Sequence, residues 1–359
     1  MSTPLRPRTI DEVVEAVRAH PKVHPVGTGT KPALASPPAG FAALSLTALS
    51  GIVEYDPGEF TVTALAGTPL AEVGAALARN GQHLPFDPPF ADAGATLGGT
   101  IAAGLSGPGR QRYGGVRDFI LGVRIVTGAG ELVRGGGKVV KNAAGFDLPK
   151  LFVGSLGRLG PIVEATFKVF PRPRATATLR VDLPDLASAL AIVGRLGSAA
   201  FDLEALEVVP GARLYIRLGG AQETFPDRLA RLAEFAGSAG SRIEGDDEAA
   251  LWKALRIRLP ASGSDLLAKV PLTLDSIQEF DRRVHAAGAS RRYSAGGNLG
   301  WLVWPAGFES LDMLLRELGL CGVALAGPAP GPLLGIRRGG EFLRRVKSAL
   351  DPDGRFAEF

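Results

Sequence analysis

The stretch that decides the fold is Ala95–Gly107, ATLGGTIAAGLSG, because almost every side chain in it is small. It lies in a longer region, Leu84–Arg117, that has little hydrophobic periodicity. Such a region inside a globular domain is usually functional or disordered, and its apolar composition argues against disorder. Small residues let the backbone approach a large flat ligand or a pyrophosphate closely. We therefore favour ligand binding over the alternative, a helix packed through glycine and alanine beneath a crowded core.

A second glycine-rich segment, Pro25–Lys31 (PVGTGTK), follows the predicted strand Val23–Val26. Its glycines allow successive backbone N–H groups to converge on an anion. It is not a Rossmann fingerprint, since it lacks a third glycine and a following helix. It is not a P-loop either, because Pro32 stands where that motif requires Ser or Thr. Nucleotide hydrolysis is therefore unsupported, and taken alone the segment predicts a tight turn.

The composition excludes several classes of protein. The chain has 359 residues, of which 46% are hydrophobic and 21% charged, which suggests about two domains with a sizeable core. One cysteine and 4 histidines exclude a disulfide framework and a cysteine-rich zinc or iron–sulfur site, and we expect no bound metal. The net charge of +4, without a basic block, gives nucleic-acid binding little support.

The same composition bears on location. No apolar run reaches the ~18 residues that a membrane helix needs, and the N-terminus (MSTPLRPRT) has no apolar signal core. We therefore expect a cytoplasmic protein without a transmembrane segment.

Periodicity and capping residues predict an α+β protein in which short strands alternate with helices. Thr9–His20 is predicted as a helix that Thr9 caps, with Glu12 completing a capping box. Pro69–Asn80 is predicted as a second helix, capped by Thr68.

The proline-rich sequence PRPR at 171–174 is the predicted domain boundary. Residues 1–174 are expected to form a first domain. Residues 175–340 are expected to form a smaller α+β domain with helices on an antiparallel sheet. Residues 341–359 are expected to return to the first domain as a helix and tail.

The N-terminal half resembles the FAD-binding domain of the vanillyl-alcohol oxidase/PCMH superfamily of FAD-linked oxidases. The matching segments include PVGTGTKP (25–32), TVTALAGTPLAEVGAALARNGQ (61–82), ATLGGTIAAGLSGPGR (95–110) and VVKNAAGFDLPKLFVGSLGRLGPIVEATFKVFPRP (139–173). Within that superfamily the sequence is most similar to the FAD-binding subunits of bacterial glycolate oxidases, through FDPP (86–89), GTIAAGLSGP (99–108), VRDFILGV (116–123), KNAAGFDLPKL (141–151) and the closing ALDPDGRF (349–356).

The resemblance implies a PCMH-type domain of two α+β subdomains with FAD between them. The pyrophosphate would lie on Val26–Lys31, and Ala95–Gly107 would pass the pyrophosphate and flavin. Gly160 and Ile162 would lie by the adenine end. The residues expected to bind the cofactor are Pro25, Val26, Gly27, Thr28, Gly29, Thr30, Lys31, Pro88, Ala95, Thr96, Leu97, Gly98, Gly99, Ala102, Ala103, Gly104, Ser106, Gly107, Tyr113, Gly114, Asp118, Gly160 and Ile162. A valine at Gly98 or Gly99 is expected to occupy the surface that the ligand contacts.

The FAD is expected to be non-covalent. Some members of the superfamily attach flavin through a His or Cys in or near these loops. Here the first loop has neither, Cys321 is far away in the sequence, and His83 precedes FDPP.

The resemblance also implies a function and partners. The chain would be the FAD-binding subunit of a glycolate oxidase-like complex, beside a paralogous catalytic FAD subunit and an iron–sulfur subunit. Its substrate would be a small 2-hydroxy acid, and any membrane association would be made through those partners.

Catalytic relatives carry a His-rich motif in the C-terminal domain, whereas the nearest stretch here, Ser294–Trp304, has no His. His285 is predicted to be a surface residue, Arg291 and Arg292 are either carboxylate ligands or surface charge, and no catalytic base is identified.

Two other functions fit the same residues. The chain can be an autonomous FAD-dependent 2-hydroxyacid or alcohol oxidoreductase, which would reduce a dye with glycolate or D-lactate when purified alone. It can also be a flavin-fold scaffold without a cofactor, which would purify colourless.

Overall fold

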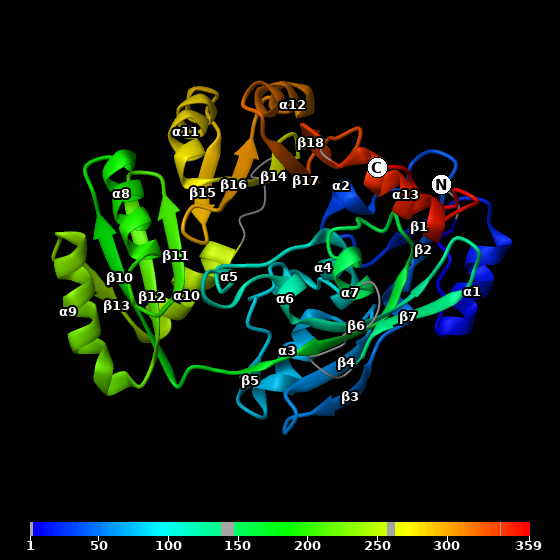
Figure 1. Cartoon of the computed structure of the whole chain (residues 1–359), viewed down its shortest axis with the longest axis horizontal. Helices are drawn as coiled ribbons and strands as arrows, with labels where there is room; N and C mark the ends of the chain where they lie inside the picture. The colour runs from blue at the N-terminus through cyan, green and yellow to red at the C-terminus, as the bar shows by residue number, and fades with distance from the viewer. Residues whose placement is uncertain (1–2, 138–146, 257–262, 338) are drawn as a thin grey trace. The chain divides into compact units, whose positions relative to one another are not determined.

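The computed structural model describes residues 3–137, 147–256, 263–337 and 339–359. These residues fall into two compact units (Figure 1). Unit 1 comprises the described residues up to Ser106, with Gly115–Arg172 and Arg337–Phe359, and unit 2 comprises Gly107–Gly114 and Pro173–Ile336. Gly107–Gly114, which the sequence places in the first domain, thus groups with unit 2. The domain limits at residues 174 and 340 remain predictions, and the KNAAGF motif at 141–146 lies outside the described residues.

The main sheet of unit 1 is antiparallel. Its described strands in spatial order are β3 (Ile52–Asp56), β4 (Thr61–Leu65), β8 (Ile162–Lys168), β6 (Ile120–Val126) and β7 (Leu132–Gly136). The central strand β8 is buried on both faces except at Glu164 and Lys168, which explains why its hydrophobic residues alternate only in part. The β6–β7 hairpin turns at Thr127–Gly130, as predicted, and Gly130 takes a φ of +75° there.

A parallel strand pair, β1 (Val23–Val26) and β2 (Ala42–Ser45), lies beside α1 (Ile10–Ala19). Thr9 caps α1 by accepting a hydrogen bond from the Glu12 N–H at 3.2 Å. The Glu12 carboxylate accepts from the Arg8 N–H at 2.6 Å, one residue before the position that the predicted capping box requires, so that half of the prediction is wrong. The core between these elements includes Val13, Val17, Val23, Leu44 and Phe356.

The helix α3 (Leu70–Ala78) begins after Pro69, and the predicted cap by Thr68 is wrong. Thr68 Oγ1 donates to the Leu65 carbonyl at 2.7 Å and accepts from the Gly51 N–H at 2.9 Å. The Thr68 hydroxyl therefore links the turn before α3 to Gly51, the residue directly before β3.

The small-residue stretch contains a short helix, α4 (Leu97–Ala103). Thr96 caps it by accepting from the Gly99 N–H at 3.2 Å, and Gly104 ends it with a φ of +60°. A Cβ at Gly98 would lie 2.7 Å from the Cβ of Ala66, so α4 packs on the sheet at a distance that only glycine allows. The glycine- and alanine-packed helix, given as the alternative for this stretch, therefore forms, and residues of the same stretch also line a pocket.

Short elements complete unit 1. They are α2 (Pro32–Ala35), the 3-10 turns η1 (Leu46–Ala48) and η2 (Ala91–Ala93), the strand pair β5 (Gln82–His83) and β9 (Phe170–Pro171), and the helices α6 (Val116–Phe119), α7 (Leu148–Phe152) and α13 (Gly340–Leu350).

Unit 2 is built on one antiparallel sheet covered by helices, as the sequence predicts. Among its described residues the strand order is β13 (Ser241–Ile243), β10 (Ala175–Asp182), β12 (Arg213–Gly220), β11 (Leu203–Val209), β15 (Ser290–Ser294), β16 (Leu299–Trp304), β14 (Leu266–Pro271), β17 (Cys321–Ala326) and β18 (Leu333–Gly335). Its helical segments are α5 (Arg110–Tyr113), α8 (Leu186–Gly197), η3 (Gln222–Thr224), α9 (Phe225–Ala236), α10 (Gly245–Arg256), η4 (Leu274–Ser276), α11 (Ile277–Ala286) and α12 (Phe308–Glu317). The α+β fold class expected from the sequence is confirmed.

Candidate functional site

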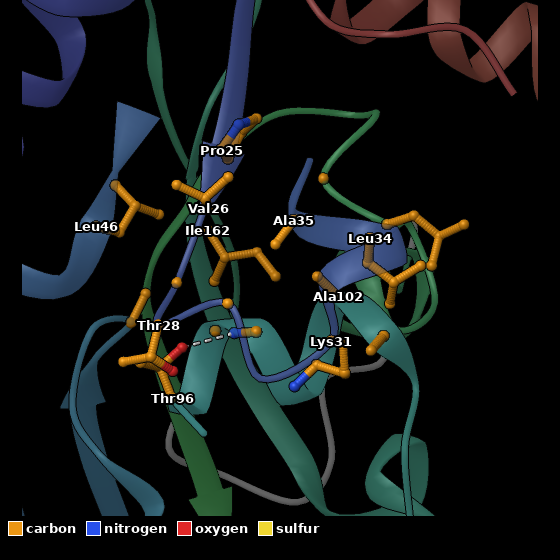
Figure 2. Close-up of a pocket in the computed structure, with 18 of the residues that line it drawn as sticks. Pro25, Val26, Thr28, Lys31, Leu34, Ala35, Leu46, Thr96, Ala102 and Ile162 are labelled. Carbon is orange, nitrogen blue, oxygen red and sulfur yellow. Dashed lines mark hydrogen bonds between the residues drawn. The ribbon is translucent and has the colours of Figure 1, made fainter. Parts of the chain in front are cut away.

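Unit 1 contains a pocket where the two glycine-rich segments meet (Figure 2). The empty space around its lining residues, part of it open to solvent, is about 690 Å³. Of the residues predicted to bind a cofactor, those that line it are Pro25, Val26, Gly27, Thr28, Gly29, Thr30, Lys31, Thr96, Gly98, Gly99, Ala102, Ala103, Gly160 and Ile162.

The first wall of the pocket is the turn that follows β1. Gly29 takes a φ of +77°, which L-residues rarely adopt, and Thr28 Oγ1 donates to the Gly94 carbonyl at 2.7 Å. Among the described residues, none accepts a hydrogen bond from the backbone N–H of Thr28, Gly29 or Thr30. This wall therefore offers a row of free donors, as an anion site requires.

The second wall is α4, with Thr96 at its start. A Cβ at Gly27 would lie 2.7 Å from Thr96 Oγ1, so the two glycine-rich segments approach each other directly. The half-buried Ala102 presents its methyl group to the pocket (Figure 2). A Cβ at Gly98 would meet Ala66, which also lines the pocket, so packing against Ala66 is a reason for glycine there that the sequence did not predict.

The third wall, the turn Leu156–Gly160, was not predicted apart from its last residue. Leu156 has a φ of +55° and Gly157 a φ of +73°, and the Leu156 N–H donates to the Ala102 carbonyl at 2.8 Å. A Cβ at Gly160 would lie 2.4 Å from the Val126 carbonyl oxygen. The sequence signal was present as GSLGRLG, but spacing alone did not tell a pocket wall from an ordinary turn.

Four further lining residues also escaped prediction: Leu34, Ala35, Leu46 and Ala66. They are ordinary apolar residues whose place in the pocket depends on how distant segments pack. Leu34 and Ala35 belong to α2, which the His24 ring meets through a hydrogen-bond contact of 3.0 Å between Nε2 and the Leu34 carbonyl.

Lys31 gives the pocket its charge. Its side chain is buried, with 7% of the residue exposed, and Nζ donates to Thr30 Oγ1 at 2.8 Å and lies 5.3 Å from the centre of the Phe90 ring. Burial lowers the pKa of Lys31 to about 8. In the part of the chain that the structure describes, no carboxylate forms an ion pair with it. A buried cation without a protein counter-ion favours an anionic ligand.

The other predicted residues do not line the pocket. Several have local roles in unit 1: Ser106 Oγ accepts from the Val116 N–H at 2.9 Å, Asp118 Oδ2 accepts from the Gly115 N–H at 2.7 Å, and Gly104 ends α4. Ala95 and Leu97 are buried and Pro88 is half-buried.

Gly107, Tyr113 and Gly114 group with unit 2. There the Tyr113 hydroxyl donates to Glu204 Oε1 at 3.3 Å, and Arg112 Nη1 lies 3.4 Å from the same oxygen. Burial, and next the Glu204 charge, raise the pKa of Tyr113 to about 12. Whether Tyr113 also meets a cofactor remains a prediction.

Arg291 and Arg292, the two residues considered as carboxylate ligands, each have a carboxylate partner within unit 2. Arg291 donates to both oxygens of Asp281, including Nη2 to Oδ2 at 2.8 Å, and Arg292 Nε lies 2.9 Å from Oε2 of the fully buried Glu207. His285 is exposed, and its Nδ1 lies 3.2 Å from Arg291 Nη1. These arginines are therefore part of internal ion pairs.

Over the residues that the structure describes, no group of three or more His, Cys, Asp or Glu side chains is placed to hold a metal ion. Within the same ranges, every helix is too short or too polar to cross a bilayer.

Comparison with known proteins gives relatives for both halves of the chain. The FAD binding domain family matches residues 4–136. The chain is 34% identical over 357 residues to glycolate oxidase subunit GlcE of Escherichia coli K12, covering 97% of this chain and 94% of that protein. It is 32% identical over 180 residues to glycolate oxidase subunit GlcD of Bacillus subtilis 168, covering 49% of this chain and 38% of that protein.

A solved structure supports the fold. The structure of alkyldihydroxyacetonephosphate synthase superposes with a TM-score of 0.69 at 16% identity, covering 98% of this chain and 74% of that one. At this level of identity the likeness concerns the fold alone.

Proposed function

The chain belongs to the family of glycolate oxidase subunit GlcE, and from that premise we propose that it holds non-covalent FAD in the unit 1 pocket as the flavin-bearing subunit of a multi-subunit glycolate oxidase-like complex. Its N-terminal part is an FAD-binding domain of the PCMH type. When bound, FAD can accept the two electrons that an alcohol gives up as it is oxidised.

One observation carries the proposal: the pocket combines a buried cation with free backbone donors. Lys31 has no ion-pair partner among the described carboxylates, and the N–H groups of Thr28, Gly29 and Thr30 have no described acceptor. The pyrophosphate of FAD supplies the missing negative charge and acceptor oxygens. The residues present therefore fit this cofactor.

The remaining pocket residues suit the rest of a dinucleotide. The small side chains of α4 and the turn Leu156–Gly160 leave room for a flat ring system, and Ile162 adds an apolar contact. We assign the cofactor contacts to the lining residues. For Pro88, Ala95, Leu97, Gly104, Ser106, Gly107, Tyr113, Gly114 and Asp118, the assignment rests on the family resemblance.

We place substrate oxidation on a partner. No described residue of the pocket is a His, Asp or Glu able to take the hydroxyl proton of a 2-hydroxy acid, and both Arg291 and Arg292 are occupied by carboxylates. A paralogous FAD subunit would oxidise the small 2-hydroxy acid, and an iron–sulfur subunit would carry electrons onward. On the sequence alone we propose a cytoplasmic location, with any membrane attachment through those partners.

The experiment that tests this role is reduction of the bound flavin under anaerobic conditions, followed by absorption. We expect glycolate to leave the flavin of the isolated chain oxidised, and to reduce it when the partner subunits are present. Bleaching of the isolated chain by glycolate would instead show an autonomous oxidoreductase. A chain that purifies colourless and takes up no flavin would show a scaffold.

A further inference from the structure

We propose that Lys347 is a positioning residue for the cofactor pocket: it ties the C-terminal segment, Gly340–Phe359, to the turn Leu156–Gly160 that forms the third wall. The structure describes all of this segment, and none of its residues lines the pocket. The inference rests on the proposed function, because its readout is the binding of FAD.

The Lys347 ammonium group is fully occupied inside the protein. Nζ donates to the Arg158 carbonyl at 2.7 Å, to the Phe356 carbonyl at 2.9 Å and to Asp351 Oδ2 at 2.6 Å. These bonds use all the N–H donors that an ammonium group has. The two charged side chains are 6% and 0% exposed, so this is a buried, satisfied pair.

The most deeply buried side chain of α13 is that of Lys347. Of the residues of α13, all of which the structure describes, Lys347 alone is buried, whereas Leu343, Val346 and Leu350 are half-buried and Phe342 is 68% exposed. A helix that served only to cover a core would bury its apolar side chains most deeply. In α13 the ammonium is buried more deeply than they are, and it reaches a backbone carbonyl of the pocket turn.

The turn that it reaches requires support. Leu156 is held at a φ of +55°. A residue other than glycine adopts this backbone conformation only when its surroundings enforce it. On one side the Leu156 N–H is bonded to the Ala102 carbonyl of α4. On the other side the Arg158 carbonyl is bonded to Lys347. The turn is therefore fixed between a pocket helix and the C-terminal segment.

The same ion pair also reaches the first wall. Asp351 accepts from the N–H groups of Arg355 and Phe356 at 2.8 and 2.9 Å, which fixes the backbone of this tail. The Arg355 carbonyl accepts from the Val23 N–H at 2.8 Å, at the start of β1. The Arg355 guanidinium donates to carbonyls at the end of α1, including that of His20 at 2.9 Å. Because β1 leads into Pro25–Lys31, Lys347 and Asp351 support two walls together.

The test is FAD affinity of the full-length chain carrying Lys347→Met, measured by quenching of flavin fluorescence well below the unfolding temperature. We expect the dissociation constant to rise at least tenfold, and backbone hydrogen exchange to accelerate at residues 156–160. Leu77→Ala is the control, because it removes a buried side chain of α3, which contributes no pocket residue. We expect that variant to lose stability and keep its affinity.

A second variant guards against failure to fold. Lys347→Gln retains an amide that can still donate to one carbonyl, so we expect a folded protein with intermediate affinity. Wild-type affinity in a folded Lys347→Met or Lys347→Gln variant would overturn the inference, as would an equal loss of affinity in Leu77→Ala. Absence of FAD binding by the wild-type chain would overturn the proposed function itself. That outcome is distinct from failure of the inference, which requires a wild-type chain that binds FAD.

Discussion

Gly27 and Thr96, which both line the pocket, lie so close together that a Cβ at Gly27 would lie 2.7 Å from Thr96 Oγ1. Thr96 is not free to turn away, because its hydroxyl caps α4 through the Gly99 N–H. The contact joins the turn after β1 to the start of α4, and so sets the spacing of the two walls that would hold a dinucleotide.

Gly27→Ala should therefore weaken FAD binding at least tenfold, because the new methyl group displaces Thr96 or the turn. Thr96→Ala alone should cost about 1 kcal/mol of stability through the lost cap. The double variant should recover part of the affinity that Gly27→Ala loses, since the next nearest atom to the new Cβ is then 3.7 Å away. Titration of each variant with FAD measures these affinities.

The matched control is Gly74→Ala, at a helical position with nothing within 4 Å of the new Cβ. Additive effects on FAD affinity in the double variant would refute a direct contact between Gly27 and Thr96.

Ala102→Leu should abolish FAD retention while leaving the fold intact. The Ala102 side chain is half-buried on α4 and lines the pocket, so a larger side chain takes space that the ligand needs. Flavin content after purification, together with circular dichroism, measures both effects. Ala71→Leu on the exposed face of α3 makes the same chemical change away from the pocket and should stay yellow. A yellow Ala102→Leu protein with full flavin content would contradict the pocket assignment.

FAD affinity should fall as the pH rises above about 8, the lowered pKa of Lys31. Binding an anion beside Lys31 favours its charged form and raises its pKa, so binding takes up a proton above this pH and the dissociation constant rises by up to ~10-fold per pH unit. Below this pH the ammonium is already formed and the affinity should be flat with respect to this group. Lys31→Met should bind weakly and lack the change. An unchanged pH profile in that variant would show that another group titrates.

The ligand-free protein should show the opposite trend in stability. Burial lowers the folded-state pKa of Lys31 from 10.5 to about 8, so the unfolded chain binds more protons between these values, and the contribution of Lys31 to the free energy of unfolding rises with pH across that window. Comparing wild type with Lys31→Met by denaturant unfolding at pH 8 and pH 10 isolates this contribution. A difference between the two proteins that does not change with pH would show that Lys31 is not desolvated.

Acid precipitation should release the flavin into the supernatant, because no described pocket residue is a His or Cys that could carry a covalent bond. The absorption of the supernatant and of the redissolved pellet measures the partition. Flavin that stays with the precipitated chain would disprove a non-covalent site.

The sequence was sufficient wherever local chemistry determined the structure. Thr9 predicts the start of α1 because its side chain caps the helix within the segment itself. The turn at Thr127–Gly130 follows from a glycine with positive φ between two strands. The residues of the first wall, Pro25–Lys31, all line the pocket as the family resemblance implies, whereas Gly27 and Gly29 by themselves predicted only a tight turn.

What the sequence did not reveal depends on packing between distant segments. α4 forms although glycine and alanine dominate it, because Gly98 brings it against Ala66 and tertiary contact overrides weak propensity. Leu34 and Leu156 are ordinary apolar residues until α2 and the Leu156–Gly160 turn place them in the pocket. Thr68 was misassigned because its hydroxyl meets Gly51, which is remote in sequence.

The most direct test of the central claim is titration of the isolated full-length chain, stripped of any flavin, with FAD and with FMN as comparison. We predict saturable binding of one FAD per chain, with much weaker binding of FMN, because FMN lacks the pyrophosphate that Lys31 and the N–H groups of Thr28–Thr30 would hold. Equal affinity for FMN, or no saturable binding of FAD, would contradict the account.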